Sequence, residues 1–403
     1  MVAFDRNPQD FKYLRLLSRQ FPTEQSAFTE IINLSAILNL PKGTEHFMSD
    51  VHGEYEAFMH ILNNCSGVVR EHVDEIFGET LSFDEKGELC TLIYYPREKI
   101  ELVRSQREDS PTWYKTILDQ LIMVARSLSS RYTRSKVRKA IPRDYAYIID
   151  ELLHTHPDEN NYRVRYHERI VESILETASA DDFIESLASL IKRLAVDHLH
   201  LVGDIFDFWF EYKRVVPKGF VRVLGKLCEL TDRGIRVVFM TGNHDMWVRD
   251  YFEAECGVEV YTSPRIMELA GKRVFLAHGD NMKIDHLPVL RFMNAVFRSK
   301  TIRFLFSWLV HPDWAMRFGQ WWSGKSRKSH LVSEMGDHIT DPLIEYAREY
   351  AGAERPDYFI FGHMHQPRDY SEGNLRVLCL GEWHSDPVYA VIDPEGNASL
   401  KKY

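Results

Sequence analysis

Five short apolar segments of this sequence each end in a cluster of aspartate, histidine or asparagine residues. The segments are EHFMSDVHG (45–53), VDHLHLVGDIFD (196–207), IRVVFMTGNHD (235–245), RVFLAHGD (273–280) and PDYFIFGHMH (356–365). Each is rich in β-branched or aromatic residues and stops at a glycine, which is typical of a buried strand followed by a turn. Helical patterns lie between several of them, for example at 221–233 and 343–350, and this alternation predicts an α/β layered fold. In such folds the polar residues at the strand ends gather where the loops converge.

The residues at these strand ends are of metal-binding types. Carboxylate and amide oxygens together with imidazole nitrogens suit Mn, Fe or Zn rather than a cysteine-based structural zinc site. Among these side chains only a carboxylate can bridge two cations, and two cations roughly 3.5–4 Å apart can clamp a phosphate and activate water. We therefore predict metal ligation, with Asp204 as the bridge, by Asp50, His52, Asp204, Asn243, His278, His363 and His365.

Any one of these motifs alone could be a strand-end turn whose polar side chains are hydrogen-bonded within the protein. The metal hypothesis therefore depends on the fact that the same pattern occurs at the ends of five strands. Two residues are predicted to be catalytic, Asp204 and His244. His244 could contact the phosphate or protonate the leaving group, and a structural role is nearly as well supported. Asp207 fits a hydrogen-bond acceptor as well as a ligand, whereas Asp245 and Asp280 are expected to orient neighbouring loops. The histidines inside the second strand are interpreted as core residues.

A long, mainly helical stretch separates the first strand from the second. The segments 112–130 and 182–195 carry apolar residues at three- and four-residue intervals. A second helical insert, rich in Phe, Leu and Trp, follows the fourth strand. We therefore predict a first segment with one core strand and helix at 1–69, an inserted helical lobe at 70–180, and the remainder of the core domain at 181–403 with a helical lid at 287–330.

Composition narrows the function classes. The chain has 403 residues, of which 44% are hydrophobic and 27% charged, so it can bury a large core. Its net charge of −9 argues against a nucleic-acid partner. Five cysteines without metal-ligand or disulfide spacing are typical of a reducing compartment. There is no signal-peptide pattern, and no apolar run reaches the roughly 18 residues that span a bilayer. We expect a cytoplasmic protein, with peripheral contact with the inner membrane left open.

The order of the motifs resembles that of the calcineurin-like metallophosphoesterase superfamily: Asp-Xaa-His, Gly-Asp-Xaa-Xaa-Asp, Gly-Asn-His-Asp, His-Gly-Asp and Gly-His-Xaa-His. The resemblance implies an α/β fold with a two-sheet metallophosphoesterase sandwich, here carrying an inserted helical lobe and a helical lid. It also implies two divalent metal ions, which we predict to be Mn²⁺. By this resemblance Asp50, His52, Asp204 and His365 would surround one ion, and Asp204, Asn243, His278 and His363 the other.

Below the superfamily level the sequence resembles two families. Residues from about 10 to 207 resemble class III fructose-1,6-bisphosphatase, through stretches such as TEIINLSAILNLPKGTEHFMSDVHGEYEAF and SSRYTRSKVRKAIP. Residues from about 196 to 403 resemble UDP-2,3-diacylglucosamine hydrolase, the diphosphatase of lipid A synthesis, through GDIFDFWFEYKRVVPKGF, TGNHDMWVRDYFEAECGV and HPDWAMRFG. The two resemblances meet at the strand 196–207, and each part lacks ligands that the other supplies.

Two features favour the second family's substrate. The bisphosphatase motif continues Arg-Gly-Pro, where a guanidinium could hold phosphate, whereas Phe208, Trp209 and Phe210 follow Asp207 here. The insert after the fourth strand is basic and apolar, as expected of a lid that receives acyl chains, although its aromatic residues could instead pack on the core. We predict that the substrate is bound by Arg291, Arg298, Arg303 and Trp209.

The predicted function is therefore hydrolysis of UDP-2,3-diacylglucosamine to UMP and 2,3-diacylglucosamine 1-phosphate. The alternative is a class III fructose-1,6-bisphosphatase that releases fructose 6-phosphate and phosphate, and it gains weight because the inserted helical lobe could obstruct an acyl pocket. A third hypothesis is an inactive phosphoesterase scaffold used for binding, against which the complete ligand set argues. The expected partners are accordingly a phosphorylated small molecule or a glycolipid nucleotide, and no nucleic acid.

Overall fold

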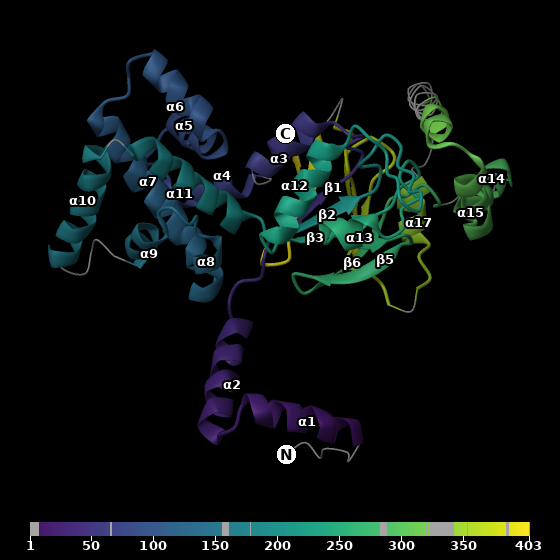
Figure 1. Ribbon diagram of the computed structural model, residues 1–403, viewed down its shortest axis with the longest axis horizontal. Helices are drawn as coiled ribbons and strands as arrows, with labels where there is room; N and C mark the ends of the chain where they lie inside the picture. Colours follow the sequence, from purple (N-terminus) through teal and green to yellow (C-terminus); the bar gives the residue numbers. More distant parts are fainter. Residues whose placement is uncertain are drawn as a thin grey trace.

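The computed structural model describes residues 8–64, 67–154, 161–177, 179–282, 288–319, 321, 342–352, 354–383 and 387–402. Two β-sheets lie at the centre of the molecule, and a lobe of helices lies beside them (Figure 1). The predicted α/β fold with a two-sheet sandwich is confirmed.

The larger sheet has six strands in the order β11-β10-β1-β2-β3-β4. Their bounds are β1 Glu45–Met48, β2 His198–Val202, β3 Arg236–Met240, β4 Glu259–Tyr261, β10 Val388–Ile392 and β11 Ala398–Lys402. Strands β1 to β4 are parallel, whereas β10 is antiparallel to both β1 and β11. Because parallel strands end at the same edge, the turns that follow β1, β2 and β3 meet there.

The smaller sheet has five strands in the order β5-β6-β7-β9-β8. Their bounds are β5 Arg265–Leu269, β6 Lys272–Ala277, β7 Tyr358–Phe361, β8 Arg368–Glu372 and β9 Leu375–Cys379. Strands β6, β7 and β9 are parallel, and β5 and β8 are antiparallel edges. One cluster of buried side chains joins the two sheets, with Phe47 and Val202 from the larger sheet and Ile360 and Leu378 from the smaller one. Strand β1 is buried along its whole length, as expected of a strand covered on both faces.

Helices cover the outer faces of both sheets. On the larger sheet, α3 (Tyr55–Asn64), α12 (Val221–Asp232) and α13 (Tyr251–Cys256) pack on β2 and β3. On the smaller sheet, Phe275 contacts Tyr346 of α17 (Pro342–Arg348) and Tyr350 just after it. Each sheet is therefore covered by helices on its outer face and by the other sheet on its inner face.

The helical lobe is inserted between α3 and β2. It consists of α4 Val68–Phe77, α5 Phe83–Tyr94, α6 Pro96–Ser105, α7 Pro111–Ser129, α8 Arg134–Ala140, α9 Ala146–His154, α10 Asn161–Glu176 and α11 Ala180–Ala195. Helix α11 buries an apolar stripe that includes Phe183, Leu187 and Leu194, and it packs on α5, α6 and α7 before it leads into β2. The predicted lobe, 70–180, ends at the first residue of α11, although this helix packs on the other lobe helices. The division of the chain into domains at these boundaries stays a prediction.

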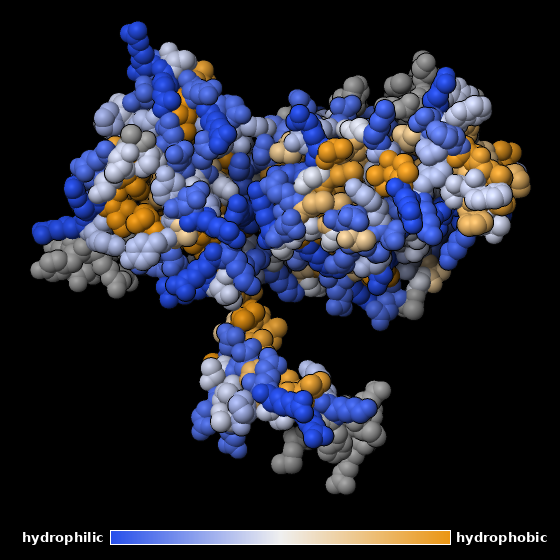
Figure 2. All heavy atoms as spheres, viewed as in Figure 1, coloured by the Kyte–Doolittle hydropathy of each residue, from blue (hydrophilic) through white to orange (hydrophobic). Residues whose placement is uncertain are grey.

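Two further helix pairs expose much of their apolar surface. Helices α1 (Pro8–Gln20) and α2 (Glu24–Leu38) form an arm that projects from the body, and α2 has no buried residue (Figure 1). Helices α14 (Pro288–Arg298) and α15 (Lys300–Leu309) belong to the predicted lid, which is described over 288–319 and at 321. Figure 2 shows apolar side chains gathered over α14 and α15, where Phe304 and Trp308 are exposed. Among the described helices, none is both long and apolar enough to cross a bilayer.

A buried carboxylate lies at the opposite ends of β1 and β2 from the converging turns. Glu45 contacts His198 Nδ1 and His200 Nε2 at 2.7 Å each, and His200 is fully buried with its ring stacked on Phe47. Burial alone would raise the pKa of Glu45, but the two imidazoles lower it from 4.5 to about 2. A carboxylate with a lowered pKa stabilises the fold fully above pH 4.5, and this contribution is lost as the pH falls toward 2.

We expect Glu45→Gln to lower the free energy of unfolding at neutral pH by about 2 kcal/mol, because the amide can accept from only one imidazole. The difference from wild type should shrink as the pH falls from 4.5 toward 2, because Glu45 of the unfolded chain becomes protonated in this range while the folded carboxylate stays charged. Urea unfolding from pH 7 to pH 3 measures both effects. Glu253→Gln, at an exposed position on α13, is the matched control and should change little. A gap that stays constant with pH would contradict this account of Glu45.

Candidate metal centre

The strand-end turns hold five of the predicted ligands in an unusual backbone conformation. Among the described residues, seven that are not glycine have a positive φ, and five of these are predicted ligands: Asp50, His52, Asp204, His363 and His365. This conformation costs about 1–3 kcal/mol per residue and persists only where the surroundings impose it. Here backbone bonds impose it, since Asp50 N–H donates to Gly203 O and His52 N–H donates to Asp204 O, each at 3.0 Å. Strain of this kind is concentrated at functional sites.

The first group of potential ligands consists of Asp50, His52 and His365, whose donor atoms lie within 4.8 Å of one another. The Nε2 atom of His365 lies 3.3 Å from Asp50 Oδ1, and the rings of His52 and His365 meet edge to face at 5.3 Å. His52 is buried, and among the described residues neither of its ring nitrogens has a hydrogen-bond partner, although Nδ1 lies 3.8 Å from Asp207 Oδ1. A buried polar atom normally has a partner, so an unsatisfied ring nitrogen at this position fits a metal ion.

The second group consists of Asp204, His278 and His363, again within 4.8 Å. His278 Nδ1 donates to the carbonyl of Val202 at 2.9 Å, which leaves Nε2 facing Asp204 Oδ2 at 3.1 Å and Asn243 Oδ1 at 3.2 Å. A backbone carbonyl that fixes one imidazole nitrogen and turns the other inward is the usual support of a metal-binding histidine. The donor set of both groups therefore suits divalent metal ions.

The two groups are adjacent. The backbone N–H of His363, a member of the second group, donates to Asp50 Oδ2 of the first at 3.0 Å. His244 N–H donates to Asp204 Oδ1 at 2.9 Å, and the His244 ring lies 5.2 Å from that of His52. All seven predicted ligands thus lie at one edge of the sandwich. Asp204 falls geometrically in the second group, so its bridging role remains a prediction.

Electrostatics keep the carboxylates of Asp50 and Asp204 charged. Burial alone would raise the pKa of Asp50, but His365 and His278 lower it. Burial alone would raise the pKa of Asp204, but His278 and His244 hold it well below its usual value. Burial would lower the pKa of His278, and the facing Asp204 raises it well above its usual range. Burial and the neighbouring His278 together lower the pKa of His363 to about 4. Metal binding requires ionised carboxylates and neutral imidazoles, and the carboxylates already meet this condition.

Two carboxylates orient the surrounding loops. Asp245 is fully buried and accepts the N–H of Gly242 at 2.6 Å and that of Ile205 at 2.8 Å, so it ties the turn after β3 to the turn after β2, as predicted. Glu382 Oε2 lies 3.1 Å from His365 Nδ1 and orients that ring. We did not predict Glu382. The signal was available, because RVLCLGE (376–382) is another apolar strand that closes on Gly and an acid.

The residues predicted to bind a lipid substrate have other partners in the structure. Trp209 is 1% exposed, packs on Phe206 and Phe252, and donates from Nε1 to Glu211 at 3.0 Å, so it offers no face to a substrate. Arg298 pairs with Asp280 at 2.7 Å. The two other guanidinium groups lie on the insert: Arg303 donates to the Val248 carbonyl at 3.2 Å, and Arg291 is exposed on α14.

A two-sheet α/β sandwich with paired aspartate and histidine groups at the converging strand ends is the arrangement of the calcineurin-like metallophosphoesterases. Within that class, the family model of the Firmicute fructose-1,6-bisphosphatases matches residues 12–261, which is more than half of the chain. The chain belongs to this family.

Individual proteins agree with the family match. The chain is 58% identical over 198 residues to a class 3 fructose-1,6-bisphosphatase of Bacteroides thetaiotaomicron, covering 49% of this chain and 30% of the relative. It is 50% identical over 240 residues to one of Bacteroides fragilis, covering 59% and 34%. The chain thus spans about a third of the length of these relatives. Among solved structures it is similar to an archaeal phosphodiesterase, with 10% identity, a TM-score of 0.27, and coverage of 52% of this chain and 84% of that one.

The prediction of UDP-2,3-diacylglucosamine hydrolysis was wrong. The bisphosphatase match continues past the predicted join at 196–207 and through β4, and the relatives carry the bisphosphatase name. The aromatic run after Asp207 does not indicate a lipid-binding site. In the structure Trp209 and Phe210 are core residues, and Phe210 packs on Trp247 and on Phe306 of α15. With that substrate, the glycolipid-nucleotide partner and the membrane contact also lose their support.

Proposed function

We propose that this chain hydrolyses a phosphoric ester at a centre of two divalent metal ions, and that the ester is fructose 1,6-bisphosphate. The observation that carries the proposal is the family match over 12–261, which includes Asp50, His52, Asp204 and Asn243. The other proposed ligands, His278, His363 and His365, lie outside the matched residues. They nevertheless complete both groups in the structure, which supports a full metal centre.

The proposed ligand sets follow the geometry. Asp50, His52 and His365 would hold one ion, and Asp204, Asn243, His278 and His363 would hold the other. The carboxylate of Asp204 is proposed to join the two. Mn²⁺ is the proposed ion, because carboxylate, amide and imidazole donors without cysteine suit it. When bound, the ions supply charge stabilisation for the phosphoryl group and activate the attacking water.

His244 is proposed to protonate the leaving oxygen. Its Nδ1 must carry a hydrogen, because it donates to the carbonyl of Asp207 at 2.8 Å. Its Nε2 then faces the centre, 3.8 Å from Asp204 Oδ2, and would carry the second proton of the imidazolium form, which passes to the leaving oxygen and leaves a neutral ring. A fixed imidazole whose second nitrogen points at the reacting group is suited to general acid catalysis.

The proposal is tested with the chain loaded with Mn²⁺. We expect release of inorganic phosphate and fructose 6-phosphate from fructose 1,6-bisphosphate, loss of this activity on chelation, and its return when Mn²⁺ is restored. Elemental analysis before and after chelation reports the metal independently of activity. Bound metal without turnover of any phosphoric ester would favour the inactive binding scaffold. Hydrolysis of other esters with no activity on the sugar bisphosphate would overturn the proposed substrate alone.

A further inference from the structure

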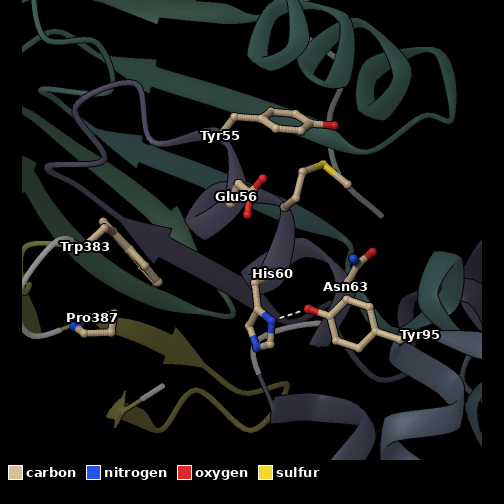
Figure 3. Close-up of a pocket in the computed structure, with 8 residues that line it drawn as sticks. Tyr55, Glu56, His60, Asn63, Tyr95, Trp383 and Pro387 are labelled. Atoms are coloured by element: carbon tan, nitrogen blue, oxygen red, sulfur yellow. Dashed lines mark hydrogen bonds between the residues drawn. The ribbon is translucent and has the colours of Figure 1, made fainter. Parts of the chain in front are cut away.

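A pocket of about 490 Å³ lies between α3, the junction of α5 and α6, and the residues Trp383 and Pro387 (Figure 3). Residues that line it include Tyr55, Glu56, Met59, His60, Tyr95 and Trp383. Its size falls within the range of about 300–1,000 Å³ that is usual for small-molecule sites. None of the ligands proposed above lines this pocket, so its role is separate from metal binding.

The pocket adjoins the first metal group through the backbone. The N–H of Trp383 donates to the carbonyl of Asp50 at 3.4 Å. The residue before it, Glu382, contacts His365. On the opposite wall, α3 begins at Tyr55, three residues after His52 in the sequence. One wall of the pocket is therefore bonded directly to the turn that carries Asp50.

The walls combine aromatic rings with hydrogen-bonding groups. Trp383 and Tyr95 supply rings, and the Tyr95 hydroxyl contacts His60 Nδ1 (Figure 3). Glu56 is an exposed carboxylate among these residues. Aromatic faces pack against the C–H faces of a small molecule while nearby polar groups fix its orientation. The carboxylate of Glu56 accepts hydrogen bonds from hydroxyl groups. This chemistry fits a carbon skeleton that carries several hydroxyl groups.

We infer that this pocket holds the hydroxyl-bearing carbon skeleton of a sugar phosphate whose phosphate lies at the metal centre. The inference rests on the proposed function and names the part of the site that recognises the sugar. It also gives the helical lobe a part in recognition, since Tyr95 lies at the junction of two lobe helices. The polar pair of Tyr95 and His60 would then be a specificity determinant rather than a catalytic one.

Binding is tested with the Mn²⁺-loaded chain and fructose 6-phosphate by isothermal titration calorimetry. Met59→Trp fills the pocket, and we expect it to raise the dissociation constant by about tenfold or more. Glu56→Ala removes a hydroxyl acceptor at an exposed position and should raise the constant severalfold without affecting the fold. Met123→Trp makes the same exchange at an exposed position on α7 and should bind like wild type.

Kinetics separate sugar recognition from damage to the metal centre. The pocket variants should lose kcat/KM for fructose 1,6-bisphosphate and keep it for p-nitrophenyl phosphate, which has no sugar. Equal losses with both substrates, or unchanged binding in Met59→Trp and Glu56→Ala, would overturn the inference. Failure of the wild-type chain to bind fructose 6-phosphate would overturn it too. If the sugar phosphate binds in a pocket-dependent manner while the bisphosphate is not hydrolysed, the proposed function fails and the assignment of the pocket stands.

Discussion

Asp204→Ala is expected to lower kcat by about three orders of magnitude or more, because the substitution removes the carboxylate proposed to join the two ions. The side chain is buried, with Oδ2 3.1 Å from His278 Nε2 and Oδ1 accepting the His244 N–H. Its loss therefore leaves an imidazole and a backbone donor without their acceptor. Metal content should fall together with activity. Phosphate-release kinetics and elemental analysis of the same preparations measure both.

Two further variants separate charge from structure. Asp204→Asn keeps the shape and an acceptor for the His244 N–H, so it should fold like wild type and still lose most activity, because a neutral amide does not bridge cations. Asp250→Ala removes an exposed carboxylate whose side chain does not cap α13, and it should remain active. Near-normal turnover in Asp204→Ala would rule out the bridging role and shift the metal proposal to other residues.

The position of the metal centre could be predicted because the sequence repeats one local pattern. Each strand ends at a glycine, and the structure shows why at three of them. A side chain at Gly203 would overlap His278, one at Gly242 would overlap Asp204, and one at Gly362 would lie 2.9 Å from Asp50 Oδ2. The glycines are needed because a ligand from the adjacent strand crowds against Gly242 and ligands from the facing sheet crowd against Gly203 and Gly362. The strand order within each sheet and the packing of the two sheets together bring the turns to one place.

The substrate could not be predicted from the same kind of pattern. An aromatic run such as that after Asp207 looks alike whether it lines a site or fills a core, and only packing distinguishes the two. Trp209 is enclosed by the rings of Phe220, which precedes α12, and of Tyr251 and Phe252 in α13. The sugar pocket was likewise not predicted, since Tyr95 and Trp383 come from distant segments. Unlike the metal ligands, the residues of this pocket belong to no motif that recurs along the chain.

Gly203→Ala tests whether the crowding at the strand ends is essential. Gly203 has φ of +84°, and an added Cβ would meet the His278 ring and lie 2.8 Å from Gly242 Cα. We expect the free energy of unfolding to fall by about 2 kcal/mol, from backbone strain. Activity should fall by about two orders of magnitude, since displacement of a group by about 1 Å from a reactive geometry has that effect. Urea unfolding and phosphate release measure the two losses separately.

The matched control for this substitution is Gly225→Ala in α12, where the backbone is helical and, apart from that backbone, no atom of the described residues lies within 4 Å of the added Cβ. Alanine is the better helix former by about 1 kcal/mol, so this variant should be slightly more stable and fully active. Opposite signs of the stability change in the two variants would show that position rather than residue type decides the outcome. If Gly203→Ala were instead as stable and active as wild type, the His278 ring would have to lie elsewhere in the functioning protein. The second metal group would then lose the residue that positions Asp204.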